Sequence, residues 1–301
     1  MRIAFITQSK AHLPELYAYR QYFESKGIEV FIFPQTPAFK ALEGYSVEWH
    51  IMGIDRLPKH PQRIKIHEYT SLSTPPFAPL KNKLKRLYNV QADIRIFQNE
   101  WLADEINLFN RKWIYREMGV ADLFFTQHSV KKEYDFVYTG SLENNRKLPA
   151  LVSSFLNNFP AHYTFLLIGN IPAWLRKLDT PRLKLVDSIP YWEVPKWLHK
   201  AEYGINYIVD QYPFNQQTST KLIEYCAAGL KIISTSYHWL DSFEKEHGGH
   251  FFRIKEDGRN FNPENLKAFQ FITPEVPDLS WDSIFSSSDF QKLLKWIGLS
   301  V

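Results

Sequence analysis

Four residues around position 220 have the types and spacing that bind an anionic ligand. Thr218 and Ser219 are typical helix N-caps, because their short hydroxyl side chains accept hydrogen bonds from first-turn amides. The apolar spacing that follows predicts a helix ending at Gly229. The start of such a helix attracts phosphate, and Lys221 adds a charge there. Glu224 lies one turn further on, so the pattern indicates a diphosphate beside a sugar hydroxyl pair, or else an ordinary capped helix.

A second anion site is expected where a strand ends at Thr139. Gly140 would let a phosphate approach the backbone closely, and Arg146 can bind it through a planar guanidinium. The alternative is a turn glycine beside a surface cation. Both this motif and the Lys221 motif follow predicted strands, at the ends where open α/β sheets bind ligands.

The elements that must position these residues form two runs of alternating strands and helices. In the first half, strands are expected at 2–7, 28–33, 49–54, 63–67 and 92–98, and helices at 15–26, 80–88 and 104–115. In the second half, strands are expected at 135–139, 163–168, 183–186, 203–209, 231–234 and 250–254. Helices are expected there at 146–158, 194–200, 239–247, 263–269 and 290–297.

This alternation predicts an α/β protein with two doubly wound, Rossmann-like sheets facing a central cleft. The polar stretch 119–134 is expected to link the domains, which gives an N-terminal domain at 1–125 and a C-terminal domain at 134–282. The C-terminal helix in 283–301 is expected to pack back on the first domain. The first turn, at 8–10, has no glycine-rich fingerprint, which argues against a dinucleotide site there.

Three motifs of the second half resemble the C-terminal domain of GT-B glycosyltransferases. They are Gly140-Ser-Leu with Arg146, Leu167-Ile-Gly169, and the run from Ser219 to Ile233. They are most similar to the large retaining family typified by sucrose and mannosyl transferases, called family 4. The resemblance spans about 135–252, whereas the first half resembles the family in its βα layout and in Ile66-His67-Glu68.

The resemblance implies a nucleoside-diphosphate sugar donor in the second domain, with UDP-sugar favoured over GDP-sugar. It implies a glycan, a lipid-linked compound or a small molecule as acceptor in the first domain. Its diphosphate-binding residues would be Gly140, Arg146, Ser219, Thr220 and Lys221. Glu224 would bind the ribose, Ile189, Pro190 and Tyr191 would bracket the base, and His67 would lie near the transferred sugar.

One departure concerns the E-x(7)-E motif of that family, whose second glutamate matches Glu224. The first position is Gln216 here, which can bond a sugar hydroxyl but cannot supply negative charge. His67 also has an alternative reading, as a hydrogen-bonded structural histidine. The histidines share no metal-ligand spacing and no Asp-x-Asp pair is present, so a metal-independent enzyme without a cofactor is expected.

Composition sets the broader frame. The chain has 301 residues, of which 45% are hydrophobic and 23% charged, which is typical of globular proteins. A single cysteine, Cys226, excludes an intrachain disulfide, and the first residues show no signal-peptide pattern, so a cytoplasmic protein is expected. The net charge of +4 does not indicate a nucleic-acid partner.

The basic helix 80–88 can lie on the inner face of an anionic membrane. Alternatively, its basic residues simply form a solvent-exposed side of the helix.

The resemblance implies a retaining hexosyltransferase of cell-surface polysaccharide or glycoconjugate synthesis. Two alternatives remain open at this point. A sugar-nucleotide epimerase with the same fold would need no acceptor. A non-catalytic subunit that binds nucleotide-sugar or glycan would fit Gln216 and the aromatic content of 16%.

Overall fold

The computed structural model describes residues 1–8, 13–51, 53–73, 76–106, 112–126, 130–142 and 147–299. Contacts divide the chain into two compact units, Met1–Gly119 with Trp281–Val301, and Val120–Ser280. Each unit is built on a six-stranded sheet in which every neighbouring pair is parallel. The predicted fold class, α/β with two doubly wound sheets, is therefore confirmed.

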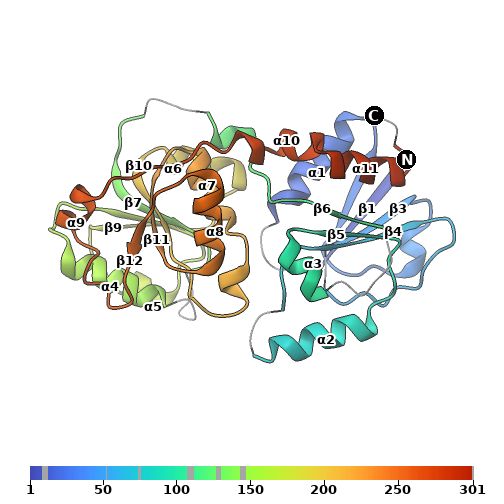
Figure 1. Cartoon of the computed structure of the whole chain (residues 1–301), viewed down its shortest axis with the longest axis horizontal. Helices are drawn as coiled ribbons and strands as arrows, with labels where there is room; N and C mark the ends of the chain where they lie inside the picture. Colours follow the sequence, from blue (N-terminus) through green and yellow to red (C-terminus); the bar gives the residue numbers. More distant parts are fainter. Residues whose placement is uncertain are drawn as a thin grey trace. The chain divides into compact units, whose positions relative to one another are not determined.

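The sheet of the first unit has the order β2-β1-β3-β4-β5-β6. Its strands are β1 (Arg2–Thr7), β2 (Glu29–Phe33), β3 (Val47–Ile51), β4 (Ile64–Tyr69), β5 (Ile94–Phe97) and β6 (Lys112–Tyr115). Because the strand order reverses direction at β1, right-handed crossovers place the connecting helices on opposite faces. One face carries α1 (Pro14–Ser25), α10 (Trp281–Ser286) and α11 (Ser288–Trp296), and the other carries α2 (Ala78–Tyr88) and α3 (Glu100–Ile106) (Figure 1).

The sheet of the second unit has the order β12-β11-β10-β7-β8-β9. Its strands are β7 (Tyr134–Thr139), β8 (Phe165–Ile168), β9 (Leu183–Val186), β10 (Ala201–Asn206), β11 (Lys231–Thr235) and β12 (Phe252–Ile254). One face carries α4 (Leu148–Asn158) and α5 (Ala173–Arg176), and the other carries α7 (Thr220–Ala227) and α8 (His238–His247) (Figure 1). Two other short helices, α6 (Val194–Leu198) and α9 (Pro263–Ala268), belong to this unit.

The two faces of the first sheet differ in chemistry, because successive residues of a strand point to opposite sides. Phe5 and Trp49 point to the side of α1, where the Phe5 and Tyr19 rings stack at 5.3 Å. Glu48 and Lys65 are register partners that point to the opposite side, and both are buried. The first sheet therefore has one aromatic face and one buried polar face.

The core of the second unit is apolar on the α4 side of its sheet. Phe136 packs against Phe155 at 5.7 Å and against Phe165 at 6.0 Å between ring centroids. Gly204 allows α7 to approach the other face, since a Cβ there would lie 2.6 Å from the Tyr225 ring. The helix that carries Lys221 thus sits directly against β10.

The strands predicted from the sequence are all present, with ends that differ by a few residues. The helix predicted at 104–115 is wrong, since α3 ends at Ile106 and Lys112–Tyr115 forms β6 beside β5. Lys-Trp-Ile-Tyr is rich in the aromatic and β-branched residues that favour a strand. The short helices α5 and α10 were not predicted. Among the residues that the structure describes, no helix has the length and apolar character needed to span a membrane.

Candidate functional site

The start of α7 is anchored by a buried polar network rather than by a side-chain cap. Ser219 is the N-cap residue, but its hydroxyl donates to Oδ1 of Asn206 at 2.8 Å and makes no bond to a helix amide. The Nδ2 group of Asn206 donates in turn to Ser234 Oγ and Tyr237 Oη, at 3.0 and 2.8 Å. The predicted capping bond is therefore wrong. The hydroxyl of Ser219 instead ties the helix start to the ends of β10 and β11.

The predicted end of α7 is confirmed. Gly229 has φ +67°, a conformation that a residue without a Cβ adopts at no steric cost. Its amide donates to the Cys226 carbonyl at 2.9 Å, and the Leu230 amide donates to the Tyr225 carbonyl at 3.0 Å. This pair of bonds is the Schellman motif, and it turns the chain directly into β11.

The structure brings together the glycine turn after β7 and the first turn of α7. Gly140 has φ +117°, and a Cβ built on it would lie 3.5 Å from Nζ of Lys221. That ammonium lies 3.8 Å from the centroid of the Tyr138 ring. Gly169, at the end of β8, faces the carbonyl of Gly140 so closely that no Cβ fits. A glycine turn beside an ammonium can accept an oxyanion. Arg146, predicted to join it, lies outside the described residues.

Tyr225 connects α7 to this turn, a link that the sequence analysis missed. Its hydroxyl accepts a hydrogen bond from the Thr139 amide at 2.9 Å and lies 3.1 Å from the Thr139 hydroxyl. Thr139 is the residue before Gly140. The bond therefore fixes the glycine turn relative to the helix that carries Lys221.

Glu224 lies one turn after Lys221 and is buried. Burial raises the pKa of its carboxyl to about 7, while the neighbouring Tyr191 side chain and the charge of Lys221 oppose that rise. The Tyr191 ring packs against Phe124 at 5.2 Å between centroids. The structure thus places a predicted ribose-binding residue against a predicted base-binding residue.

The remaining predicted residues of the second unit lie in partly exposed segments. Ile189 is half-buried and Pro190 is exposed, and both lie between β9 and the turn that begins at Tyr191. Gln216 ends a short 3₁₀ turn before α7 and is half-buried, as is Thr220.

The neighbouring Gln217 was missed by the sequence analysis. Its Nε2 atom is buried without a hydrogen-bond partner in the part of the chain that the structure describes.

His67 lies on the buried polar face of the first sheet, where it is 1% exposed. Its Nε2 atom lies 2.9 Å from Oδ2 of Asp55. Burial lowers the pKa of His67 to about 4, even though the hydrogen bond with Asp55 acts in the opposite direction. The imidazole is therefore neutral near pH 7, and its Nε2–H donates to the Asp55 carboxylate.

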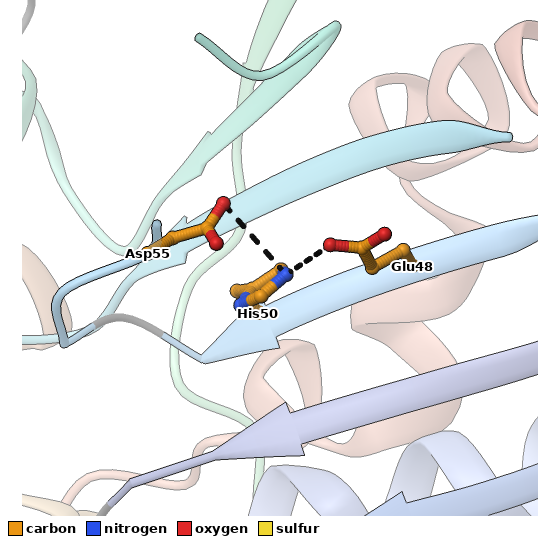
Figure 2. Close-up of side chains that lie close together, drawn as sticks. All are labelled: Glu48, His50 and Asp55. Atoms are coloured by element: carbon orange, nitrogen blue, oxygen red, sulfur yellow. Dashed lines mark hydrogen bonds and ion pairs between the residues drawn. The ribbon is translucent and has the colours of Figure 1, made fainter. Parts of the chain in front are cut away.

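Three buried side chains beside His67 have the types of metal ligands. The ligand atoms of Glu48, His50 and Asp55 lie within 4.8 Å of one another, and Figure 2 shows His50 between the two carboxylates. Lys65, however, places its Nζ atom 2.8 Å from both carboxylates. Its ammonium and the guanidinium of Arg63, which lies 3.0 Å from Glu48, together match the two carboxylates, so the cluster is a charge-balanced network. The period-two pattern of polar residues in β3 and β4 was its signal in the sequence.

Comparison with solved structures identifies the architecture. Sucrose-phosphate synthase from Thermosynechococcus elongatus aligns with a TM-score of 0.63 and 15% identity, over 99% of this chain and 95% of that chain. HepE from Anabaena, in complex with UDP-glucose, aligns with a TM-score of 0.63 and 10% identity, over 99% and 98%. WaaG, a glycosyltransferase of lipopolysaccharide biosynthesis, aligns with a TM-score of 0.61 and 9% identity, over 98% and 94%. The chain has the GT-B fold.

The same GT-B architecture occurs in the putative UDP-N-acetylglucosamine 2-epimerase from Listeria monocytogenes. It aligns with a TM-score of 0.57 and 11% identity, over 98% of this chain and 97% of that chain. No family model matches the sequence, and no curated protein sequence matches it significantly. At these identities the GT-B fold is established, and the chemistry must be argued from the site residues.

Proposed function

We propose that this chain is a glycosyltransferase that moves a hexosyl group from a nucleoside-diphosphate sugar to a glycan, a lipid-linked compound or a small acceptor. The observation that carries the proposal is the meeting of Gly140, Lys221 and Glu224 at the start of α7. A glycine turn and an ammonium suit the diphosphate, and a carboxyl one turn further on suits a ribose. A UDP-sugar is favoured, in keeping with the UDP and UDP-glucose bound to HepE.

The chemical role of the site is to stabilise the leaving group. When the bond between the sugar and the phosphate breaks, the diphosphate gains negative charge. Lys221 and the first amides of α7 oppose that charge from fixed positions, which is the electrostatic preorganisation that enzymes use most. Arg146 is proposed to add a second cation. This scheme requires no metal ion, and retention at the sugar carbon is proposed with it.

The other predicted residues take supporting roles in this proposal. Glu224 accepts hydrogen bonds from the ribose hydroxyls, while Ile189, Pro190 and Tyr191 lie beside the base. Thr220 contributes a helix-start amide. Ser219 contributes its position only, because its hydroxyl is already bonded to Asn206. His67 and Gln216 are proposed to contact the transferred sugar.

We also propose that α2 contacts the inner face of a membrane, from the cytoplasmic side. Leu87 is 69% exposed and Leu80 is 54% exposed. The same helix carries Lys81, Lys83 and Arg86 on its exposed surface. Apolar side chains beside lysine and arginine are the pattern of helices that lie on anionic lipid. Membrane contact would suit an acceptor used in cell-surface polysaccharide or glycoconjugate synthesis.

Sugar-nucleotide epimerisation is the second candidate, favoured by the similarity to the Listeria protein. The donor site would be the same, but no acceptor would be needed. The two candidates differ in one measurable way. A transferase releases the nucleoside diphosphate only as the sugar reaches an acceptor, whereas an epimerase returns an altered sugar-nucleotide without one.

The test is a thermal-shift screen of the full chain against UDP, GDP, ADP and their sugars. The best ligand is then incubated with and without a panel of acceptors and analysed by NMR. We expect a UDP-sugar to raise Tm most, and release of UDP to depend on an acceptor. An epimer formed without acceptor would favour the second candidate. Stabilisation by no nucleotide at all would overturn both.

A further inference from the structure

Helix α2 covers a cavity on the polar face of the first sheet. The cavity has a volume of about 160 Å³. Arg95 of β5 and His67 of β4 form part of its floor, and Lys85 and Arg86 of α2 form part of its cover. All of these residues belong to the first compact unit, whereas Lys221 belongs to the second.

The charges around this cavity are all of one sign. Arg95, Lys85 and Arg86 are cationic, and none of its described lining residues is an aspartate or glutamate. Asp55, which is hydrogen-bonded to His67, does not line the cavity. The Asp55 carboxylate also accepts a hydrogen bond from Lys65 at 2.8 Å, so its negative charge is already paired with a cation inside the polar network. Among the described residues that line the cavity, three are therefore cations that no lining anion compensates.

Arg95 gives the second, independent observation. The residue is 8% exposed, and its Nη1 atom is buried without a hydrogen-bond partner among the residues that the structure describes. Leaving a buried donor of a charged group unsatisfied costs more free energy than a hydrogen bond contributes. A ligand that supplies an acceptor oxygen in the cavity would remove that cost.

Side-chain hydrogen bonds hold α2 in place over the cavity. Oδ1 of Asn82 accepts from the Ser73 amide at 3.0 Å, which ties the helix to the loop after β4. Oδ1 of Asn89, just after the helix, accepts from the Asp55 amide at 2.9 Å. Burial, followed by the charge of Lys81, lowers the pKa of Lys85. Burial and the like charge of Lys81 thus make the charged form of Lys85 less favourable. A bound anion would oppose both effects and stabilise the charged form.

We propose that this cavity binds a phosphate group, carried by a lipid headgroup or by a soluble phosphorylated compound. The planar guanidinium of Arg95 matches two oxygens of a phosphate, and the two lining cations of α2 suit a dianion better than a carboxylate. The inference does not depend on glycosyl transfer. If transfer is established, it assigns a phosphate group to the acceptor.

The test measures phosphate binding to the full-length chain by thermal shift and calorimetry, at constant ionic strength. Every protein carries Lys221→Ala, so that phosphate near Gly140 does not contribute. Arg95→Gln and Lys85→Gln are compared with Lys83→Gln, which removes a cation from the exposed side of the same helix. Inorganic phosphate is the probe, and acetate is the control anion.

We expect phosphate, and not acetate, to stabilise the parent and Lys83→Gln. Binding should weaken about tenfold or more in Arg95→Gln and Lys85→Gln. No stabilisation of the parent, or equal binding by all variants, would overturn the proposal. Should Arg95→Gln fail to fold, Lys85→Gln gives the same comparison.

Two further measurements identify the source of the phosphate. Co-sedimentation with phosphatidylcholine vesicles, with and without phosphatidic acid, tests the lipid source. Glucose 6-phosphate, compared with inorganic phosphate in calorimetry, tests the soluble source. In both measurements the preference should disappear in Arg95→Gln. A preference that survives in Arg95→Gln would place the binding elsewhere and overturn the proposal.

Discussion

The Tyr191 side chain lies beside the carboxyl group of Glu224 and lowers its pKa, against the effect of burial. Because burial raises the pKa of that carboxyl to about 7, its ionisation lies within the range in which the protein would be assayed. A carboxylate can accept from both ribose hydroxyls, whereas a protonated carboxyl has less acceptor capacity. The ionisation of Glu224 should therefore add a component to nucleotide affinity that rises with pH through about 7.

We predict that Glu224→Gln weakens binding of UDP more than binding of its 2′,3′-dideoxy analogue. It should also abolish the rise in uridine affinity between about pH 6 and 8, because uridine, unlike UDP, has no phosphate that titrates in that range. Calorimetry on the wild-type protein and the variant measures both effects. Equal losses for the two nucleotides would mean that Glu224 only supports Tyr191.

Lys221→Ala should weaken binding of UDP by roughly 1.5–3 kcal/mol and leave binding of uridine nearly unchanged, since charge-assisted bonds have that strength. The ammonium lies beside Gly140, where the phosphates are proposed to bind. Lys231→Ala is the matched control, because that lysine is exposed and pairs with Glu202 at 2.7 Å. An equal loss for UDP and uridine would argue against a phosphate contact.

Local sequence was sufficient for the fold and for the ends of α7. The predicted alternation of strands and helices is present in both units. Helix α7 ends at Gly229 because that glycine adopts a positive φ, as predicted. What failed depends on partners far along the chain. The hydroxyl of Ser219 bonds Asn206 instead of a helix amide. The segment 112–115 forms a strand because its backbone pairs with the edge of β5.

The buried polar face illustrates the same limit. Glu48 and Lys65 are seventeen positions apart and meet only because β3 and β4 pair in that register. The period-two pattern shows that β3 and β4 each carry polar side chains on one face, but it does not show that Lys65 and Arg63 balance the charges of Glu48 and Asp55. The sequence therefore pointed to His67 as a single residue and missed the network that holds it.

Glu15 gives a prediction about stability. It is 1% exposed, and neither carboxyl oxygen has a hydrogen-bond partner from another described residue. Burial raises its pKa from 4.5 to about 7, although Arg116 opposes the rise. Such a group favours folding less as pH rises, because the unfolded chain loses its proton first.

The free energy of unfolding should therefore fall between pH 4.5 and about 7, by on the order of 3 kcal/mol from this group alone. Glu15→Gln should remove that part of the decline, and Glu24→Gln on the exposed side of α1 should not. Urea unfolding at about pH 5 and pH 8 measures the difference. Parallel pH profiles for wild type and Glu15→Gln would show that the carboxyl is not the cause.

The last prediction separates a catalytic His67 from a structural one. His67 belongs to the first compact unit and Lys221 to the second, so loss of the imidazole should leave the proposed nucleotide contacts intact. If His67 contacts the transferred sugar only in the transition state, His67→Gln should lower kcat and kcat/KM together and barely change UDP affinity.

His50→Gln is the matched control for this prediction. His50 lies 5.6 Å from His67 between ring centroids and is hydrogen-bonded to Glu48 on the same face of the sheet. Both variants should lower Tm, because each disturbs the buried network. Only His67→Gln should lower kcat, by about tenfold or more for the loss of a hydrogen bond made in the transition state. Normal turnover in a folded His67→Gln protein would assign the histidine to holding Asp55, and the search for a group at the sugar would move to Gln98 and Glu100.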